Sequence, residues 1–168
     1  MALPTVTPLP SSSEGPAAPV PPPAAPAAVD RLSADIVETL VRDWHQCLAD
    51  RAPVALLTSD LANGLRLDLP GGVVRGLAEF RRWYAAGDHL PLAGRGVSLT
   101  DVRVRLLSPV HGELTTTAGG GAPGAAPTRQ EWLVVLQDGA PRIRSVSVEP
   151  AAPAAPVAAG QAAVLNAA

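Results

Sequence analysis

The sequence predicts an α+β domain in which helices come first along the chain and an antiparallel sheet follows. Between residues 30 and 48 the apolar side chains recur every three or four positions, which is the spacing of an amphipathic helix. Between residues 97 and 149 apolar and polar side chains alternate over several runs, which is typical of strands. Helices followed by a run of strands favour a domain whose helices lie on one face of the sheet.

The composition places this domain between two tails rich in Pro and Ala. Residues 1–29 contain nine Pro and seven Ala, and residues 150–168 contain ten Ala and three Pro. Such segments bury too little apolar surface to offset the entropy lost on ordering, so we expect both tails to be disordered. The 120 residues from 30 to 149 contain all five aromatic residues and have the length of one ordinary domain with a single core.

Charge and cysteine content exclude several classes of function. The 13 basic residues are all Arg, the formal net charge is −2, and no basic stripe follows the chain, so we expect no nucleic-acid partner. Cys47 is the only cysteine, which excludes an intrachain disulfide and a cysteine-based zinc site. No stretch approaches the ~20 apolar residues of a membrane helix and no signal peptide is recognisable, so we expect a soluble cytoplasmic protein without membrane contact.

The first element is a helix of roughly 18 residues, with the most regular apolar spacing in the chain. Either Asp30 or Ser33 is expected to cap its N-terminus. The apolar stripe consists of side chains four residues apart, widened by two valines: Leu32, Ile36, Leu40, Trp44 and Leu48, with Val37 and Val41.

A second, short helix is predicted over residues 53–59, because a proline is well suited to the first turn of a helix. Leu56 and Leu57 are expected to face inward. Asn63-Gly64 is a turn-forming pair and is expected to end this helical region.

A β-hairpin is predicted next. Leu65, Leu67 and Leu69 alternate with charged residues, which indicates a half-buried strand. Pro70-Gly71-Gly72 then provides a turn to a short second strand over residues 73–75.

A third helix follows the hairpin. Leu77, Phe80 and Tyr84 are spaced to lie on one side of a helix of two to three turns, which we expect to pack its aromatic side on the sheet. Gly87 is expected to end this helix.

The rest of the domain is predicted to be a long antiparallel meander. Strands are expected over residues 97–107, 112–117, 129–137 and 142–149. Residues 138–141 have the composition of a compact hairpin turn, and the Gly-rich residues 119–127 that of a flexible loop.

Several short motifs distributed over the 120-residue core resemble those of the nuclear transport factor 2-like superfamily, and in particular its SnoaL-like bacterial members. They are Trp44-His45, Leu65-Arg-Leu-Asp-Leu-Pro-Gly-Gly72, Gly76-x-x-x-Phe80-x-x-Trp83-Tyr84, and Trp132-Leu-Val-Val-Leu-Gln-Asp-Gly139 with Ile143. The resemblance implies a cone, in which a strongly bent sheet wraps a long helix and leaves a cavity open at one end. It also implies a choice of functions, because the superfamily contains isomerases, polyketide cyclases, dehydratases and epoxide hydrolases beside non-catalytic binding and dimerisation modules.

The resemblance to the isomerase-like members is incomplete at the site. Asp68 matches the position of their proton-shuttling base, with one residue inserted before the proline. Trp44 stands where they have an oxyanion-binding Tyr, and Trp has a donor but no titratable proton. Their second oxyanion acid would fall near Leu133, where the nearest carboxylate is the neighbouring Glu131. The chain therefore lacks a complete isomerase site.

Two interpretations of the candidate residues remain open. Asp68 is either a desolvated general base at a cavity mouth or a turn residue paired with Arg66 or Arg75. His89 and His111 are either acids or proton relays at that mouth or solvated loop residues. The side chains that form either a ligand pocket or core are Trp44, Leu67, Phe80, Trp83, Tyr84 and Trp132.

No cofactor or metal site is expected. His45 and Cys47 point to nearly opposite sides of a helix, and neither has a second ligand one turn away. The glycines of residues 119–124 match a dinucleotide-binding pattern formally, but no strand-to-helix turn surrounds them.

Two hypotheses for function follow. In the first, the protein binds a small apolar molecule in the cone, with isomerase, cyclase or dehydratase chemistry at Asp68 as its narrower form. In the second, it is a non-catalytic module whose exposed sheet face forms a homodimer or partner interface. That face is expected to include Arg103, Arg105, Trp132 and Val134.

Overall fold

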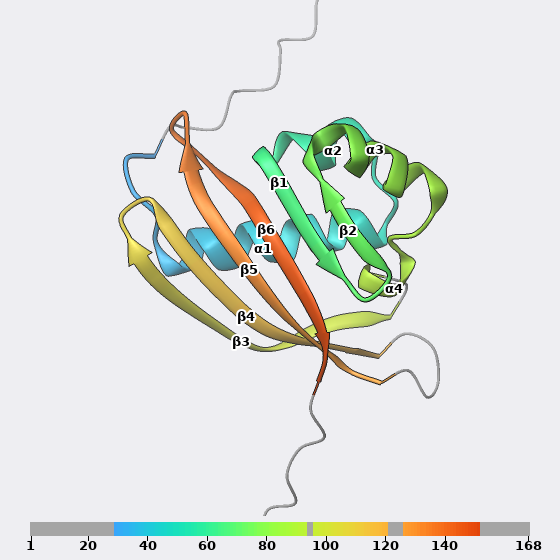
Figure 1. Cartoon of the computed structure of the whole chain (residues 1–168). Helices are drawn as coiled ribbons and strands as arrows, with labels where there is room; N and C mark the ends of the chain where they lie inside the picture. Colours follow the sequence, from blue (N-terminus) through green and yellow to red (C-terminus); the bar gives the residue numbers. More distant parts are fainter. Residues whose placement is uncertain (1–28, 94–95, 121–125, 152–168) are drawn as a thin grey trace, which may run out of the picture.

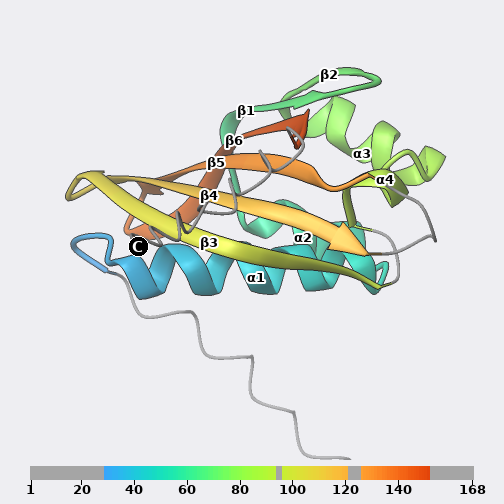
Figure 2. The ribbon, with the colours of Figure 1, turned by 90° about the horizontal axis from the view of Figure 1, so that it is seen from below.

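The computed structural model describes residues 29–93, 96–120 and 126–151. Within these ranges the chain forms a six-stranded sheet, and the long helix α1 (Ala34–Ala49) crosses one face of it (Figure 1). Strands β3 to β6 curve over α1, and their other face carries no helix (Figure 2). The predicted α+β domain with a curved sheet on a long N-terminal helix is confirmed. Of the predicted disordered tails, residues 1–28 and 152–168 lie outside the described residues, as do residues 121–125 of the predicted loop. Pro150, which was assigned to the second tail, instead ends strand β6 (Ala140–Pro150).

Helix α1 has the predicted cap and nearly the predicted buried side. Ser33 is the N-cap, and its Oγ accepts a hydrogen bond from the Ile36 amide at 3.3 Å. The side chains that the sheet covers completely are Val37, Val41, Trp44 and Leu48, and His45 is also buried. Leu32 is buried too, but it precedes the helix, and its amide donates to the Pro109 carbonyl at 2.7 Å. This bond attaches the start of α1 to the β3–β4 turn.

Helix α2 (Val54–Ser59) is confirmed, but two details of its prediction are wrong. Leu57 is buried, whereas Leu56 is 57% exposed, because adjacent residues on a helix lie about 100° apart and only one of them can face the core. Asn63-Gly64 does not end the helix, since both residues lie in strand β1 (Leu61–Leu69). Gly64, at φ +72°, marks a bulge there, where the pairing with β6 shifts register.

The sheet has the strand order β2-β1-β6-β5-β4-β3. The strands after β1 are β2 (Gly72–Arg75), β3 (Val97–Ser108), β4 (His111–Gly120), β5 (Thr128–Gln137) and β6 (Ala140–Pro150). The β1–β2 hairpin and the antiparallel meander from β3 to β6 are confirmed. One pairing was not anticipated: β1 runs parallel to β6, so the last strand of the chain joins the hairpin to the meander.

Two helices follow the hairpin, and they lie near the C-terminal end of α1. Helix α3 (Gly76–Ala86) ends at Gly87, which adopts φ +83° as a left-handed cap, as predicted. A short helix not predicted from the sequence, α4 (Leu90–Ala93), follows it. No helix in the described part of the chain is long and apolar enough to cross a membrane.

The two faces of the sheet differ in character, and the predicted exposed face is wrong at two positions. Arg103 and Arg105 are exposed, but Trp132 and Val134 are buried against the helices with 1% and 0% exposure. Their neighbours on β5, Glu131 and Leu133, face the other way. The apolar run in residues 132–136 conceals this alternation in the sequence, because a one-residue error in phase exchanges the two faces.

All five aromatic side chains and His89 form one continuous cluster. The Trp44 ring centre lies 6.0 Å from that of Phe80 and 5.6 Å from that of Trp132. Phe80 continues to Trp83 at 5.6 Å and to Tyr84 at 6.2 Å. These distances are those of favourable aromatic pairs, so the cluster links α1, α3 and β5.

Helix α1 approaches the sheet closely at Gly112. A Cβ atom at this position on β4 would lie 2.8 Å from Val37 Cγ2 of α1. We expect Gly112→Ala to destabilise the fold by about 1–3 kcal/mol, because the helix or the strand must shift. Urea unfolding measures this change.

Gly71→Ala is the matched control, because nothing lies within 4 Å of a Cβ built at Gly71. It should leave the unfolding midpoint nearly unchanged. Adding Val37→Ala to Gly112→Ala should recover part of the lost stability, because it removes the clashing methyl groups. Equal stability of Gly112→Ala and the wild type would contradict this packing.

Candidate functional site

A cavity of about 760 Å³ lies between the β1–β2 hairpin, the α3–α4 segment and the ends of β5 and β6. Its lining residues are Leu69, Pro70, Gly71, Gly72, Val73, Val74, Trp83, Gly87, Asp88, Leu92, Thr128 and Val148. Most of these side chains are apolar, and Asp88 is the one ionisable group among them. The cavity is therefore suited to an apolar molecule of small size.

The inner wall of this cavity is also the wall of the core. Val74, Leu92 and Val148 line the cavity and are at most 8% exposed. They come from β2, α4 and β6. The cavity therefore marks the end of the cone at which the packed core stops.

Three buried polar side chains lie next to this inner wall. His89, Gln130 and Trp132 are 4%, 0% and 1% exposed. Both ring nitrogens of His89, both amide atoms of Gln130 and the indole nitrogen of Trp132 lack a hydrogen-bond partner among the described residues. Such groups are rare in buried positions, because an unpaired donor or acceptor costs about 1–3 kcal/mol.

Their positions follow from the strand and the turn that carry them. Gln130 lies on the inward face of β5, two residues from Thr128 and opposite Val148 of β6, and both of these line the cavity. Trp132 is the next inward residue of the same strand. His89 lies between Asp88 and Leu92, which line the cavity from the α3–α4 side. His89 and Gln130 thus neighbour residues that line the cavity, whereas Trp132 lies one step further along β5 and is not among the lining residues.

The surroundings of His89 disfavour its charged form. Burial lowers the pKa of its imidazole and the positive charge of Arg51 lowers it further, whereas the backbone of Tyr84 and the charge of Asp88 oppose this shift. The ring packs 4.5 Å from Tyr84 and 6.0 Å from Trp83, measured between ring centres. A neutral imidazole offers one donor and one acceptor.

His45 is the other buried histidine, and it has a partner. Its Nε2 lies 3.3 Å from the Leu92 carbonyl, to which it donates, so it connects α1 to α4. Burial lowers the pKa of His45, and the bond to Leu92 opposes that shift. His45 therefore has a structural role beside the cavity.

Asp68 lies on the opposite face of β1 from Leu67 and Leu69, and so faces away from the cavity. Arg66 donates to both of its carboxylate oxygens, with Nε at 2.7 Å from Oδ2 and Nη2 at 2.8 Å from Oδ1. These hydrogen bonds hold the pKa of Asp68 below its ordinary value, the reverse of the shift expected for a desolvated base. Of the two interpretations of Asp68, this arrangement matches the ion pair with Arg66.

His111 and His89 are not brought together. His111 is exposed at the start of β4, where its Nδ1 lies 3.1 Å from Ser108 Oγ. This turn is joined to Leu32, just before α1, whereas His89 lies beside α4 at the helix's other end. The 11 helical steps from Ala34 to His45 correspond to about 17 Å.

The six predicted pocket residues separate into cavity and core. Trp83 lines the cavity. Trp44, Leu67, Phe80 and Trp132 are at most 1% exposed, and the Trp44 indole donates to the Leu57 carbonyl at 3.1 Å. Tyr84 is half-buried, and its hydroxyl donates to the Ala52 carbonyl at 2.7 Å.

Gln130 was missed by the sequence analysis. It shares the two-residue phase of Trp132 and Val134, which the sequence analysis placed on the exposed face, so its inward position became apparent only from the structure. A buried polar residue is more informative than a buried leucine, because burial is unfavourable unless its amide is paired. Among the described residues, no group of three or more potential metal ligands is present.

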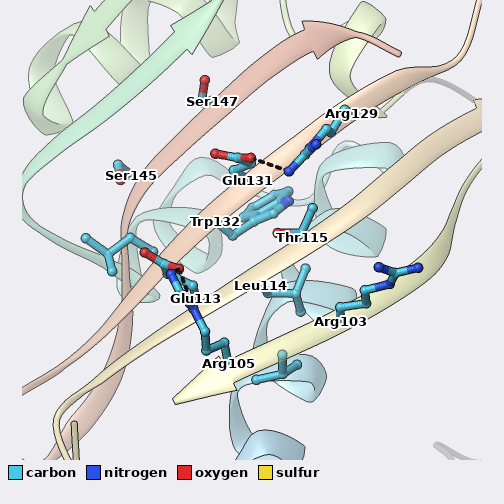
Figure 3. A pocket seen from close by; sticks show the side chains of 12 residues that line it. Arg103, Arg105, Glu113, Leu114, Thr115, Arg129, Glu131, Trp132, Ser145 and Ser147 are labelled. Atoms are coloured by element: carbon cyan, nitrogen blue, oxygen red, sulfur yellow. Dashed lines mark hydrogen bonds and ion pairs between the residues drawn. The ribbon is translucent and has the colours of Figure 1, made fainter. Parts of the chain in front are cut away.

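The outer face of the sheet has a shallower hollow of about 560 Å³ (Figure 3). Charged side chains cross it in pairs. Arg105 contacts Glu113 at 2.6 Å and Arg129 contacts Glu131 at 2.8 Å. Ser145 and Ser147 of β6 complete this surface, which has the character of a solvated or partner-binding face.

Comparisons with known proteins identify the fold. No family model and no curated protein matches this sequence. Among solved structures, a protein of unknown function with a cystatin-like fold from Nostoc punctiforme is similar over 75% of this chain and 98% of its own, with 16% identity and a TM-score of 0.59.

Two similar structures have enzyme names. A candidate ketosteroid isomerase from Shewanella frigidimarina covers 66% of this chain and 92% of its own, with 20% identity and a TM-score of 0.55. A candidate dehydratase of the NTF2-like family from Streptomyces avermitilis covers 71% and 96%, with 16% identity and a TM-score of 0.58. At these identities the similarity establishes the fold, so this chain has the cystatin-like cone fold of NTF2-like proteins.

The buried histidines predict how stability depends on pH. Because the pKa of each is lowered in the folded state, the unfolded chain binds more protons as pH falls below the ordinary imidazole pKa of about 6.5. Their contribution to stability is therefore complete above that pH and is lost below it. We expect the urea midpoint to fall between pH 7.5 and pH 5.5.

His89→Gln should make this pH dependence less steep, because it removes one of the two groups. His111→Gln is the matched control for the loss of a histidine, since its side chain is exposed. An unchanged slope in His89→Gln would show that His89 is not buried as a neutral group.

Proposed function

We propose that this protein binds a small, largely apolar molecule in the 760 Å³ cavity at the open end of the cone. The observation that carries the proposal is the composition of the cavity wall. Val74, Leu92 and Val148 present core side chains to a space large enough for a ring system, and ligand sites typically have about 300–1,000 Å³. Burying a ligand there would remove apolar surface from water on both partners.

The similar structures support a ligand-binding role in a general way. Two of them are named for isomerase and dehydratase activities, and another has no known function. The same fold therefore occurs with and without an assigned activity, and the cavity of this chain has to be judged from its own residues.

Isomerase, cyclase or dehydratase chemistry with Asp68 as general base is a narrower proposal, and the observations on Asp68 do not support it. A base that removes a proton next to a carbonyl has to reach the ligand, and a raised pKa favours its action. Asp68 faces away from the cavity and is paired with Arg66, which lowers its pKa. We therefore propose ligand binding and assign no reaction to this residue.

A thermal-shift screen against apolar ketones, steroids and polycyclic polyketide-like compounds tests the proposal. A ligand should raise the melting temperature in a concentration-dependent way, by an amount that follows RT ln(1 + [L]/Kd). Val148→Phe should abolish this shift, because the larger ring would occupy the cavity.

The matched control is Ser147→Phe, which places the same ring on the opposite face of the same strand. It should bind as the wild type does, and so should Asp68→Asn. The proposal fails if no compound stabilises the wild type, or if Val148→Phe retains the full shift.

A second proposal, compatible with the first, is a homodimer formed through the outer face of the sheet. In its favour, the hollow on this face lies over strands β3 to β6 and contains groups of both charges (Figure 3). No helix of the described residues covers it (Figure 2). Arg103 has no ion-pair partner among the described residues and is available to a carboxylate of a second copy. A sheet-to-sheet contact would exclude water from the ion pairs Arg105–Glu113 and Arg129–Glu131.

Sedimentation equilibrium tests the dimer. Leu133 lies in the outer hollow, so Leu133→Arg should shift the equilibrium to monomer by placing a further charge in the contact. Leu56→Arg is the matched control, because Leu56 is exposed on α2 and away from this face. A wild type that stays monomeric at high micromolar concentration would contradict the dimer.

A further inference from the structure

The last strand of the sheet brings the chain to the edge of the cavity. Val148 of β6 and Thr128 of β5 both line the cavity. A little further along each strand, the Ala151 amide donates to the Pro127 carbonyl at 2.9 Å. Residues 152–168 therefore start beside the cavity, at a point that the sheet fixes.

The Pro/Ala-rich residues 1–28 join the fold at a different place. The amide of Val29, which follows them, donates to the Gly139 carbonyl in the β5–β6 turn at 2.9 Å. The 11 residues of β6 separate this turn from Ala151, which corresponds to about 35 Å of extended strand. Of the two segments, residues 152–168 begin beside the cavity and residues 1–28 begin at the other end of β6.

Part of the cavity wall is apolar and still accessible. Val73 of β2 is 42% exposed, and Leu69 of β1 and Trp83 of α3 are half-buried. Covering these side chains would remove apolar surface from water. An uncharged occupant suits this wall, because a charged group would lose its hydration there.

Residues 152–168 have the chemistry of such an occupant. They contain no Asp, Glu, Lys, Arg or His, and their apolar side chains larger than Ala are Val157, Val164 and Leu165. No Pro follows Pro156 among them, so residues 157–168 keep full backbone freedom. A flexible chain of 14 residues has an average span of about 20 Å, which is enough to reach across a cavity of this size from Ala151.

We propose that residues 157–165 turn back and occupy the cavity with the side chains of Val164 and Leu165. Attachment at Ala151 gives the segment a millimolar effective concentration at the cavity, so a weak apolar contact is sufficient. A small molecule in the same cavity then competes with the protein's own chain. The inference shares the cavity with the proposed function but requires no external ligand.

The indole N–H signal of Trp83 in NMR spectra of the full chain tests the occupancy without added ligand. Val164→Asp combined with Leu165→Asp should move this signal, because a carboxylate is unfavourable in an apolar space and Asp88 repels it. The Trp44 signal should stay in place, since its N–H is paired in the core. Val164→Ile combined with Leu165→Met keeps apolar side chains and should leave the Trp83 signal near its wild-type position.

Val6→Asp combined with Leu9→Asp is the matched control, because it places the same two charges in residues 1–28. It should leave the Trp83 signal unchanged. Equal shifts in the two Asp double variants, or no shift in either, would overturn the inference. A wild-type Trp83 signal that moves on dilution would overturn it too, because the occupant would then belong to a second copy.

An added apolar probe measures the competition. Isothermal titration with tetralin should give a Kd about fivefold lower for the Val164→Asp/Leu165→Asp variant than for the wild type, the factor expected if the segment leaves the cavity open in about one molecule in five. The control variant with Asp at positions 6 and 9 should bind as the wild type does.

The two readouts separate this inference from the proposed function. If the Trp83 signal moves in the Val164→Asp/Leu165→Asp variant but neither this variant nor the wild type binds tetralin or any compound of the thermal-shift screen, the segment occupies the cavity and the proposed function fails. If the wild type and the variant bind tetralin equally and the Trp83 signal does not move, ligand binding stands and occupancy by the segment is wrong.

Discussion

The indole of Trp44 joins four elements of this fold, and the position of the cavity depends on it. From the C-terminal half of α1 it packs edge-on against Trp132 of β5 and at a tilt against Phe80 of α3, and its N–H donates to the Leu57 carbonyl of α2. Burial of this large side chain fixes how closely the sheet approaches the helix. Glycine at position 112 then allows β4 to reach Val37 directly.

Close packing around Trp44 does not extend to the open end of the cone. At that end the cavity lies between the β1–β2 hairpin, the α3–α4 segment and the ends of β5 and β6. Two of the buried polar residues without a partner in the described chain, His89 and Gln130, neighbour residues that line this space.

Most of the fold was predictable from the sequence, because α1, the β1–β2 hairpin and the meander have clear local periodicity and turn residues. The long-range pairing of strands was not predictable from the sequence, since no local pattern specifies that β6 lies parallel to β1. The site was predicted less well. The motif around Asp68 was compatible with a general base or with a turn residue paired with Arg66 or Arg75, and strand phase turns this side chain outward to Arg66. Only the three-dimensional register reveals that Gln130 is buried.

The most direct test of the account is an NMR measurement of the tryptophan indole N–H signals during titration with an apolar ketone. Trp83 lines the cavity, whereas the Trp44 N–H is bonded to the Leu57 carbonyl in the core. The account predicts that the Trp83 signal shifts along a saturation curve while that of Trp44 stays in place. Saturable binding that leaves the Trp83 signal unmoved would contradict a ligand site in the cone.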